Sequence, residues 1–249
     1  MSGEDPNSIE ISISEIYDQL QYVPASASKK EKEPEEFEEI HDDFNENRIR
    51  KSCTEVSGDI DYKRFLIFKT HPVAAALKAF KNDSVIYTDT PLMRAAILSR
   101  ILDENEKALI DKPRGGFDSD KPVKKTIIRV PEIICAAEHP KAEEFAKKYN
   151  VSKSMAGFMI LKEDIQKSIV IIGKDDSALL SVCRMAERGS LPYLVLGFPA
   201  GINTQMSSKE YLADIPVELP LITMSQTKGG VEAAAACLVE LMKIYEESR

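Results

Sequence analysis

The fold is decided by the stretch SIVIIGKDDSALLSVCRMAERGSLPYLVLG, residues 168–197. It contains two apolar runs, SIVIIG and LPYLVLG, on either side of DDSALLSVCRMAERG. The middle segment begins with acidic residues and ends at a glycine, which is typical of a helix. Strands that are apolar throughout are buried on both faces, as in a parallel sheet covered by helices. The stretch therefore predicts a strand, a helix and a second parallel strand.

The same alternation extends in both directions from this unit. On the N-terminal side, SVIYT at 84–88 predicts a strand, and Thr90 and Pro91 are suitable residues for the start of a following helix. Either KTIIRV or EIICA supplies the next strand, and one or two helices precede residue 168. On the C-terminal side, PLITMS predicts the last strand and GGVEAAAACLVELMKIYEE the last helix. We therefore expect an α/β protein with a doubly wound, mostly parallel sheet of about five strands.

Two regions do not follow this pattern. Between residues 31 and 46 there are nine acidic side chains and one lysine, a net charge of −8 that equals the net charge of the whole chain. We expect residues 1–45 to form an acidic N-terminal arm, serving solubility or, alternatively, interaction. Residues 46–249 then form a single domain. The polar stretch at about 103–125 is expected to be an insertion, either a flap or a disordered loop.

Charge and composition exclude several classes of protein. Outside the acidic window the charges balance at 32 against 32, so nothing favours nucleic acid or an anionic membrane as a partner. No apolar run approaches the roughly 18–20 residues of a membrane span, and the N-terminus does not resemble a signal peptide. We expect a cytoplasmic protein with no metal site, whose four widely spaced cysteines are reduced and mostly buried.

A ligand site is expected at the carboxyl ends of the strands, where loops lead into helices. The loops there contain Asp89 and Thr90, Lys174, Gly201, and the pair Gly229 and Gly230. Backbone N–H groups at helix N-termini bind carboxylates or phosphates without a charged side chain, whereas glycine is also the usual residue in tight turns. No dinucleotide, P-loop or hydrolase motif is present. Together the loops predict a polar cleft for an anionic ligand.

Two C-terminal segments resemble the signature of the precorrin-8X methylmutase family, which includes the cobalt-precorrin-8 methylmutases. They are LVLGFPAGINTQMSSKEYL at 194–212 and PLITMSQTKGGVEAAAACLVEL at 220–241. The signature consists of G-x-P-x-G, then S-K-E, and later a glycine pair before an alanine-rich helix. Further segments resemble the family in the same order, and the resemblance covers residues 46–249 apart from the insertion; the segments are SGDIDYKRFLIF, IYTDTPLMRAAI, NVSKSMAGF and IVIIGKDDSAL.

The resemblance implies a flavodoxin-like fold and an isomerase of cobalamin (corrin) biosynthesis. Members of this family move a methyl group from ring carbon 11 to ring carbon 12 of precorrin-8X or of its cobalt form. They are homodimers, need no cofactor, and act on a tetrapyrrole that carries many carboxylates. In the proposed mechanism a histidine protonates or hydrogen-bonds the macrocycle while the methyl group migrates.

Glu55 stands at the position that the resemblance assigns to this histidine, in SCTEVSGDIDY at 52–62. The arginine before Ser154 is replaced by Lys153, and two arginines near the glycine pair are replaced by Ser225 and Thr227. The resemblance implies Glu55 as the catalytic residue. It implies the following substrate-binding residues: Asp89, Thr90, Lys153, Ser154, Gly201, Ser208, Lys209, Gly229 and Gly230.

Three functions are compatible with these replacements. In the first, the protein is a methylmutase in which Glu55 acts as general acid, provided that burial raises its pKa toward neutrality. In the second, it is a paralogue that lacks the family histidine and binds a tetrapyrrole or another polycarboxylate without isomerising it. In the third, it acts on an altered substrate through Lys153, Lys174 and Lys209. For Glu55 the structural alternative is an exposed carboxylate, and for each lysine it is a solvated cation.

Overall fold

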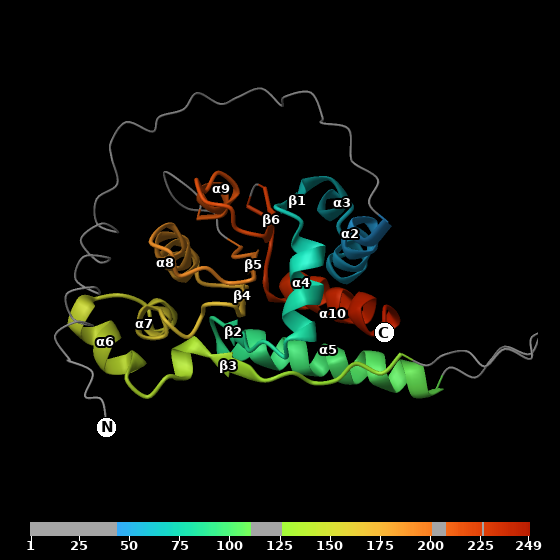
Figure 1. Cartoon of the computed structure of the whole chain (residues 1–249), viewed down its shortest axis with the longest axis horizontal. Coiled ribbons are helices and arrows are strands. Elements are labelled where there is room, and N and C mark those ends of the chain that lie inside the picture. Colours follow the sequence, from blue (N-terminus) through green and yellow to red (C-terminus); the bar gives the residue numbers. More distant parts are fainter. Residues whose placement is uncertain (1–43, 111–125, 201–207, 226) are drawn as a thin grey trace, which may run out of the picture.

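The computed structural model describes residues 44–110, 126–200, 208–225 and 227–249. A six-stranded sheet in the order β1-β6-β5-β4-β2-β3 forms its centre, with helices on both faces (Figure 1). The strands are β1 (Leu66–Lys69), β2 (Ile86–Thr88), β3 (Ile133–Cys135), β4 (Ile169–Ile172), β5 (Leu194–Gly197) and β6 (Leu221–Met224).

The five strands β2 to β6 are parallel to one another, and only β1 is antiparallel, to β6. Numbered by themselves along the chain, the parallel strands have the order 2-1-3-4-5 of flavodoxin-like sheets. The predicted doubly wound, mostly parallel sheet is therefore confirmed. Of the two candidates for its second parallel strand, EIICA forms β3.

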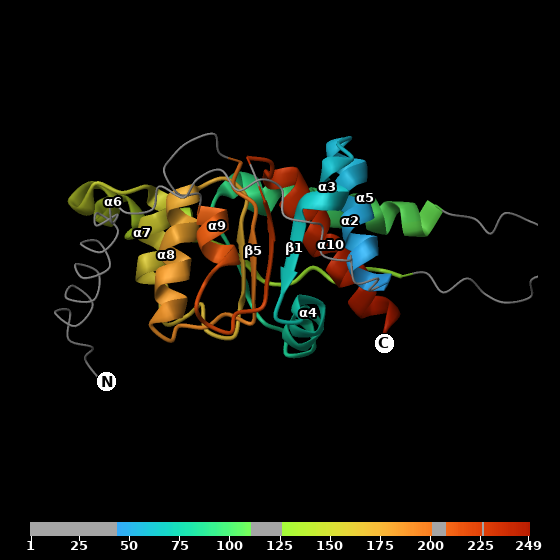
Figure 2. The ribbon, with the colours of Figure 1, turned by 90° about the horizontal axis from the view of Figure 1, so that it is seen from above.

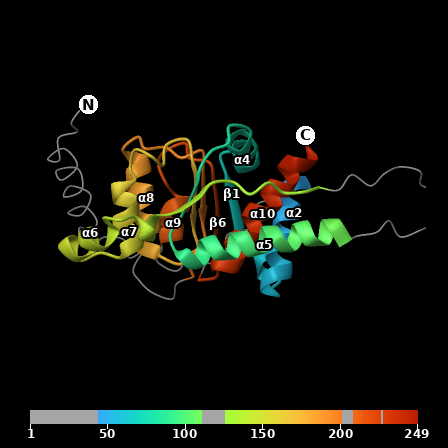
Figure 3. The same ribbon diagram turned by 90° about the horizontal axis from the view of Figure 1, so that it is seen from below.

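Alternate residues of the strands point into two separate cores. On one face, residues such as Ile169 and Ile171 pack with apolar side chains of four helices. These are α2 (Phe44–Ser57), α4 (Pro72–Lys81), α5 (Pro91–Ile110) and α10 (Val231–Glu247). Helix α10 begins with small, fully buried alanines, because it lies between the sheet and the outer helices α2 and α5 (Figure 3).

On the other face, Val170 and Ile172 pack with the remaining larger helices. These are α6 (Ala142–Tyr149), α7 (Lys153–Ile160), α8 (Asp176–Glu187) and α9 (Ser208–Ala213), and two short elements, α3 (Asp61–Phe65) and the 3-10 helix η1 (Ala136–Glu138), complete the fold. All four residues of β4 are fully buried. Burial of each such side chain contributes about 1.5–3 kcal/mol, so this central strand anchors the two cores.

The structure differs from the sequence-based expectation in two places. Strand β1 is a sixth strand, paired antiparallel at the edge of the sheet. Helix α5 continues to Ile110, so residues 103–110 are helical and do not belong to a loop. The charged sequence DENEKALI is compatible with a helix because Glu104 forms ion pairs with Lys107 and with Lys243 of α10.

The carboxyl ends of the parallel strands lie at the edge of the sheet that also carries α3 (Figure 2). The N-terminus of α10 and the C-terminal part of α2 reach the same edge, where α3 contacts the residues that precede α10. Residues 1–43, most of the predicted acidic arm, lie outside the described part of the chain, and α2 begins at Phe44.

Candidate active site

The strand order changes direction between β2 and β4, and ligands of open α/β sheets usually bind beyond the carboxyl ends of the strands at such a point. Asp89, the residue after β2, is fully buried there. Its Oδ2 atom accepts hydrogen bonds from the backbone N–H groups of Lys174 (2.8 Å) and Asp175 (3.0 Å), and its Oδ1 atom accepts one from Thr90 Oγ1 (3.3 Å). Desolvation raises the pKa of Asp89, while these hydrogen bonds counteract the rise. The carboxylate thus cross-links the two strand ends.

Thr90 has a local role at the start of α5. Its Oγ1 atom accepts a hydrogen bond of 3.2 Å from the backbone N–H of Met93, as the sequence predicted for an N-terminal cap. Asp89 and Thr90 therefore lie at the predicted edge, but their polar atoms are engaged with the protein itself. We keep their contact with substrate as a prediction.

Hydroxyl groups join the start of α8 to the first residue of α9 and to the cap of α7. Ser208 Oγ donates a hydrogen bond of 2.5 Å to Asp176 Oδ1. Ser177 lies 3.1 Å from Ser152 through their Oγ atoms, and Ser152 caps α7. The helix N-termini of α7, α8 and α9 are consequently held together at this edge.

Lys209 and the glycine pair lie where α9 meets the start of α10. Lys209 is only 3% exposed, and its Nζ atom donates a hydrogen bond to the carbonyl of Lys228. Burial lowers the pKa of Lys209, while the charges of Asp176 and Glu210 favour its protonated form. The ammonium group is thus bound by the protein itself, and its contact with substrate stays a prediction.

Gly229 and Gly230 allow the loop before α10 to approach the end of β5. At Gly229, with φ of +153°, a Cβ atom would lie 2.4 Å from the carbonyl oxygen of Phe198. The N–H of Gly230 donates a hydrogen bond of 2.6 Å to the same oxygen. Gly229 is thus required for close backbone packing, whereas Gly230 is favoured by its φ of +114°. Both are structural reasons for glycine that need no ligand.

Three further residues, from α3 and the turn before it, contact this loop and were not recognised in the sequence. Tyr62 Oη donates to the carbonyl of Gly229 (2.7 Å) and accepts from its N–H (3.1 Å). Lys228 Nζ forms ion pairs with Asp59 (2.6 Å) and with Asp61. Because Tyr62 and Gly229 are 167 residues apart in the chain, spacing along the sequence carried no signal for this contact.

The structure places Lys153 and Ser154 at the first turn of α7. Lys153 is largely exposed and lies 3.4 Å from a carboxylate oxygen of Glu143, whereas Ser154 is buried. Gly201 lies outside the described residues. In the described part of the chain, no three His, Cys, Asp or Glu residues gather into a metal-binding cluster.

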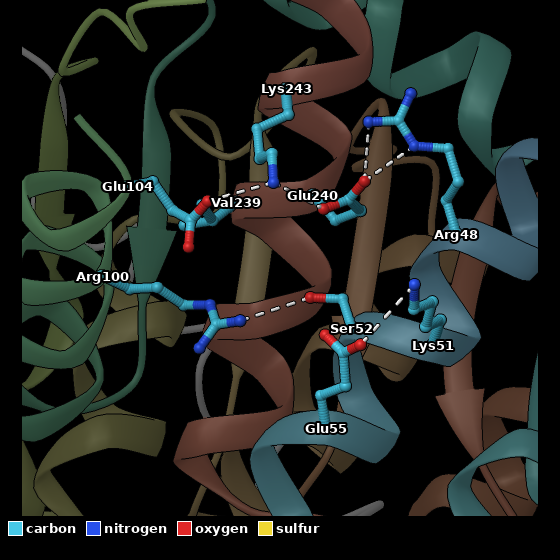
Figure 4. A pocket seen from close by; sticks show the side chains of 9 residues that line it. All are labelled: Arg48, Lys51, Ser52, Glu55, Arg100, Glu104, Val239, Glu240 and Lys243. Carbon is cyan, nitrogen blue, oxygen red and sulfur yellow. Dashed lines mark hydrogen bonds and ion pairs between the residues drawn. The ribbon is translucent and has the colours of Figure 1, made fainter. Parts of the chain in front are cut away.

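Glu55 lies on the last turns of α2, with a side chain that is 64% exposed and 3.7 Å from Lys51 Nζ. It borders a cavity of about 210 Å³ between α2, α5 and α10 (Figure 4). In the single chain Glu55 is therefore an exposed carboxylate, which is the alternative to a catalytic role. Its role as a general acid stays a prediction, because that role requires a covering group that removes water from the carboxyl.

Comparison with known proteins identifies the family. The model of the precorrin-8X methylmutase family matches residues 33–114 and 121–244. The chain belongs to this family. The resemblance found in the sequence is thus confirmed, and the match is interrupted only inside the predicted insertion. It begins inside the predicted arm, so the boundary between arm and domain stays a prediction.

Individual relatives agree with this assignment. The chain is 27% identical to the cobalt-precorrin-8 methylmutase of Methanocaldococcus jannaschii over 79% of each chain. It is 25% identical to that of Priestia megaterium, over 73% of this chain and 70% of the relative. The solved precorrin-8X methylmutase of Thermus thermophilus matches with a TM-score of 0.64 and 20% identity, covering 97% of this chain and 98% of the other. This last similarity supports the fold.

Two properties complete the description of the methylmutase-family chain. None of the described helices is long and apolar enough to cross a membrane. All four cysteines, Cys53, Cys135, Cys183 and Cys237, are buried free thiols, as the sequence predicted.

Proposed function

We propose that this protein is a methylmutase of cobalamin biosynthesis that converts precorrin-8X, or cobalt-precorrin-8, by moving a methyl group from ring carbon 11 to ring carbon 12. The family match over most of the chain carries this proposal. It favours an isomerase over a protein that binds a tetrapyrrole without changing it. The reaction is an isomerisation, since the bond from the methyl group to carbon 11 breaks and a bond to carbon 12 forms within one molecule.

The carboxyl edge of the sheet suits a substrate with many carboxylates. Buried Lys209 and the N-terminus of α10 lie at this edge, where backbone N–H groups can bind carboxylates. These groups bind and orient the macrocycle. Charge-assisted hydrogen bonds of this kind contribute about 1.5–3 kcal/mol each.

Glu55 is our candidate for the group that donates a proton or hydrogen bond to the macrocycle. A bound macrocycle over the C-terminal part of α2 would cover Glu55 and exclude water from its carboxyl group, which the role of a donor to the ring requires.

An anaerobic absorbance time course with precorrin-8X, repeated with its cobalt form, tests the proposal. Conversion of the spectrum to that of the corrin chromophore at a rate proportional to protein concentration is the expected result. A spectrum that shifts at once and then stays constant would show binding without isomerisation and would establish the second function. The absence of any spectral change with either compound would contradict both isomerisation and binding of these tetrapyrroles.

We also propose a homodimer. Helix α5 exposes large apolar side chains, among them Leu102 (64%) and Leu109 (64%), which lie two turns apart on the same side of the helix. Such side chains are often covered by a partner. The cytoplasmic location stays a prediction, which cell fractionation would check.

A further inference from the structure

The cavity between α2, α5 and α10 contains a cation whose hydrogen bonding is incomplete (Figure 4). Arg100 on α5 makes one hydrogen bond, from Nη2 to Ser52 Oγ at 3.3 Å. Its Nε atom is buried and has no partner among the described residues. Within that same part of the chain, no carboxylate lies within ion-pair distance of this guanidinium.

The other three cations of the cavity differ from Arg100 in this respect. Arg48 binds Glu240 at 2.8 Å, and Lys243 binds Glu104 at 3.0 Å. Lys51 lies 3.7 Å from Glu55. The carboxylates of the cavity are therefore already satisfied by neighbouring cations, and the guanidinium of Arg100 retains free N–H groups for an external acceptor.

The size of the cavity restricts what can enter it. Its volume of about 210 Å³ lies below the roughly 300–1,000 Å³ of clefts that enclose drug-sized ligands. A macrocycle does not fit, whereas a single carboxylate-bearing arm does. The planar guanidinium matches the two oxygens of a carboxylate. Ser52 Oγ donates its own hydrogen to the carbonyl of Ala236 (3.5 Å) and accepts from Arg100, so it orients the guanidinium.

We propose that Arg100, oriented by Ser52, binds one peripheral carboxylate arm of the substrate, with the macrocycle lying outside the cavity next to Glu55. This inference rests on the proposed function for the identity of the ligand. The geometry supports it because Ser52 and Glu55 lie on the same helix and both line the cavity. A carboxylate held by Arg100 would position the ring over Glu55.

Equilibrium binding of the corrin product hydrogenobyrinate, followed by absorbance, tests this proposal. The ligand is compared with a set of its monoamides, in each of which one peripheral carboxylate has become an amide. For the wild-type protein we expect one monoamide to bind about ten- to hundredfold more weakly than the parent, the range of one charge-assisted pair. Arg100→Gln should bind the parent with that same loss and should no longer discriminate against this monoamide. Ser52→Ala should lose a smaller factor on the same ligand.

The matched control is Arg129→Gln, which removes an exposed arginine far from the cavity and paired with Asp83. It should bind all ligands as the wild type does. If Arg100→Gln does not fold, Arg100→Lys is used in its place. This variant retains the charge and should lose only the part of the ligand affinity that comes from bidentate binding. Equal discrimination by the wild type and the Arg100 variants would overturn the inference.

Turnover of precorrin-8X separates this result from a failure of the proposed function. If Arg100→Gln isomerises precorrin-8X and binds the product as the wild type does, the proposed methylmutase activity is supported and the carboxylate subsite is contradicted. If product affinity depends on Arg100 but the wild-type protein shows no turnover, the subsite is supported and the methylmutase activity is contradicted.

Discussion

The Oδ2 atom of Asp89, at the end of β2, accepts a hydrogen bond of 2.8 Å from the backbone N–H of Lys174, which follows β4. The strand order changes direction at this point, so the bond joins the ends of two neighbouring strands at the edge where a ligand is expected. Asp89 is fully buried, and removal of its acceptors would leave two N–H groups without partners. The geometry of these two strand ends therefore depends on one carboxylate.

Replacement of Asp89 separates the need for an acceptor from the need for a charge. Asp89→Asn retains one oxygen that can face Lys174 and Asp175, and we expect it to fold with a small loss of stability. Asp89→Leu leaves both N–H groups buried and unpaired, at about 1–3 kcal/mol each. Urea denaturation measures the difference, and equal stability of the two variants would contradict this role.

The pH dependence of stability provides a second test of Asp89. Burial raises its pKa in the folded state, so its protonated form is favoured on folding. Its contribution to stability is fully present below the unfolded value of about 3.9 and is lost as the pH rises through the folded-state pKa. We expect the stability of the wild type relative to Asp89→Asn to fall as the pH increases from about 4. A stability difference that does not change with pH would show that the pKa of Asp89 is not raised by folding.

The contact between α3 and the loop before α10 leads to a second prediction. Tyr62→Phe removes the hydroxyl that both donates to and accepts from Gly229. We expect a loss of about 1–2 kcal/mol in unfolding free energy and weaker substrate binding, since the loop at the α10 N-terminus would move. Tyr245→Phe, on the far end of α10, is the matched control and should leave binding unchanged.

The ion pair of Lys228 with Asp59 leads to a prediction about the titration of Asp59. The hydrogen bond from Lys228 lowers the pKa of Asp59. The stabilising contribution of the pair is thus present above the unfolded value of about 3.9 and is lost as the pH falls through the lower folded-state pKa. In Lys228→Met the pKa of Asp59 should rise toward its ordinary value, as measured by carboxyl-carbon NMR. An unchanged titration would show that the pair does not form in solution.

These contacts show what the sequence could and could not predict. The buried strand Ile169–Ile172 was evident because a run of apolar residues needs no partner to be recognised. β1 was not predicted, because Leu66–Lys69 is a short strand at the sheet edge that is only partly buried. The interaction of Tyr62 with Gly229 depends on tertiary packing, and the charged end of α5 was assigned to a loop because its ion pair with α10 is also tertiary.

Gly229 leads to a prediction about backbone packing. In Gly229→Ala the new Cβ would lie 2.4 Å from the Phe198 carbonyl oxygen, at a φ of +153°. Strain and overpacking together should cost about 3 kcal/mol or more and should displace the N-terminus of α10. Gly189→Ala is the control, because Gly189 also has a positive φ but an added Cβ there would meet no described atom within 4 Å. It should cost only about 1–2 kcal/mol, as measured by denaturation.

The proposed homodimer predicts a response to charge on α5. Leu102→Glu places a carboxylate on the apolar side of the helix, where burial against a partner would be unfavourable. We expect the variant to be monomeric by light scattering while its fold, followed by circular dichroism, is unchanged. A wild-type protein that is monomeric at micromolar concentration would contradict the proposal directly.

Glu55 provides the last prediction, which concerns the chemical step. If its carboxyl donates to the bound macrocycle, Glu55→Gln should reduce turnover by about a hundredfold or more and leave the affinity for the product unchanged. Glu55→His restores the residue type of the family and should retain turnover, with a rate that falls as the pH rises above about 6.5. Lys51→Met removes the partner of Glu55 without removing the carboxyl and should retain turnover. Equal rates for all four proteins would show that the proton comes from elsewhere, since an amide and a carboxylic acid differ by orders of magnitude as proton donors.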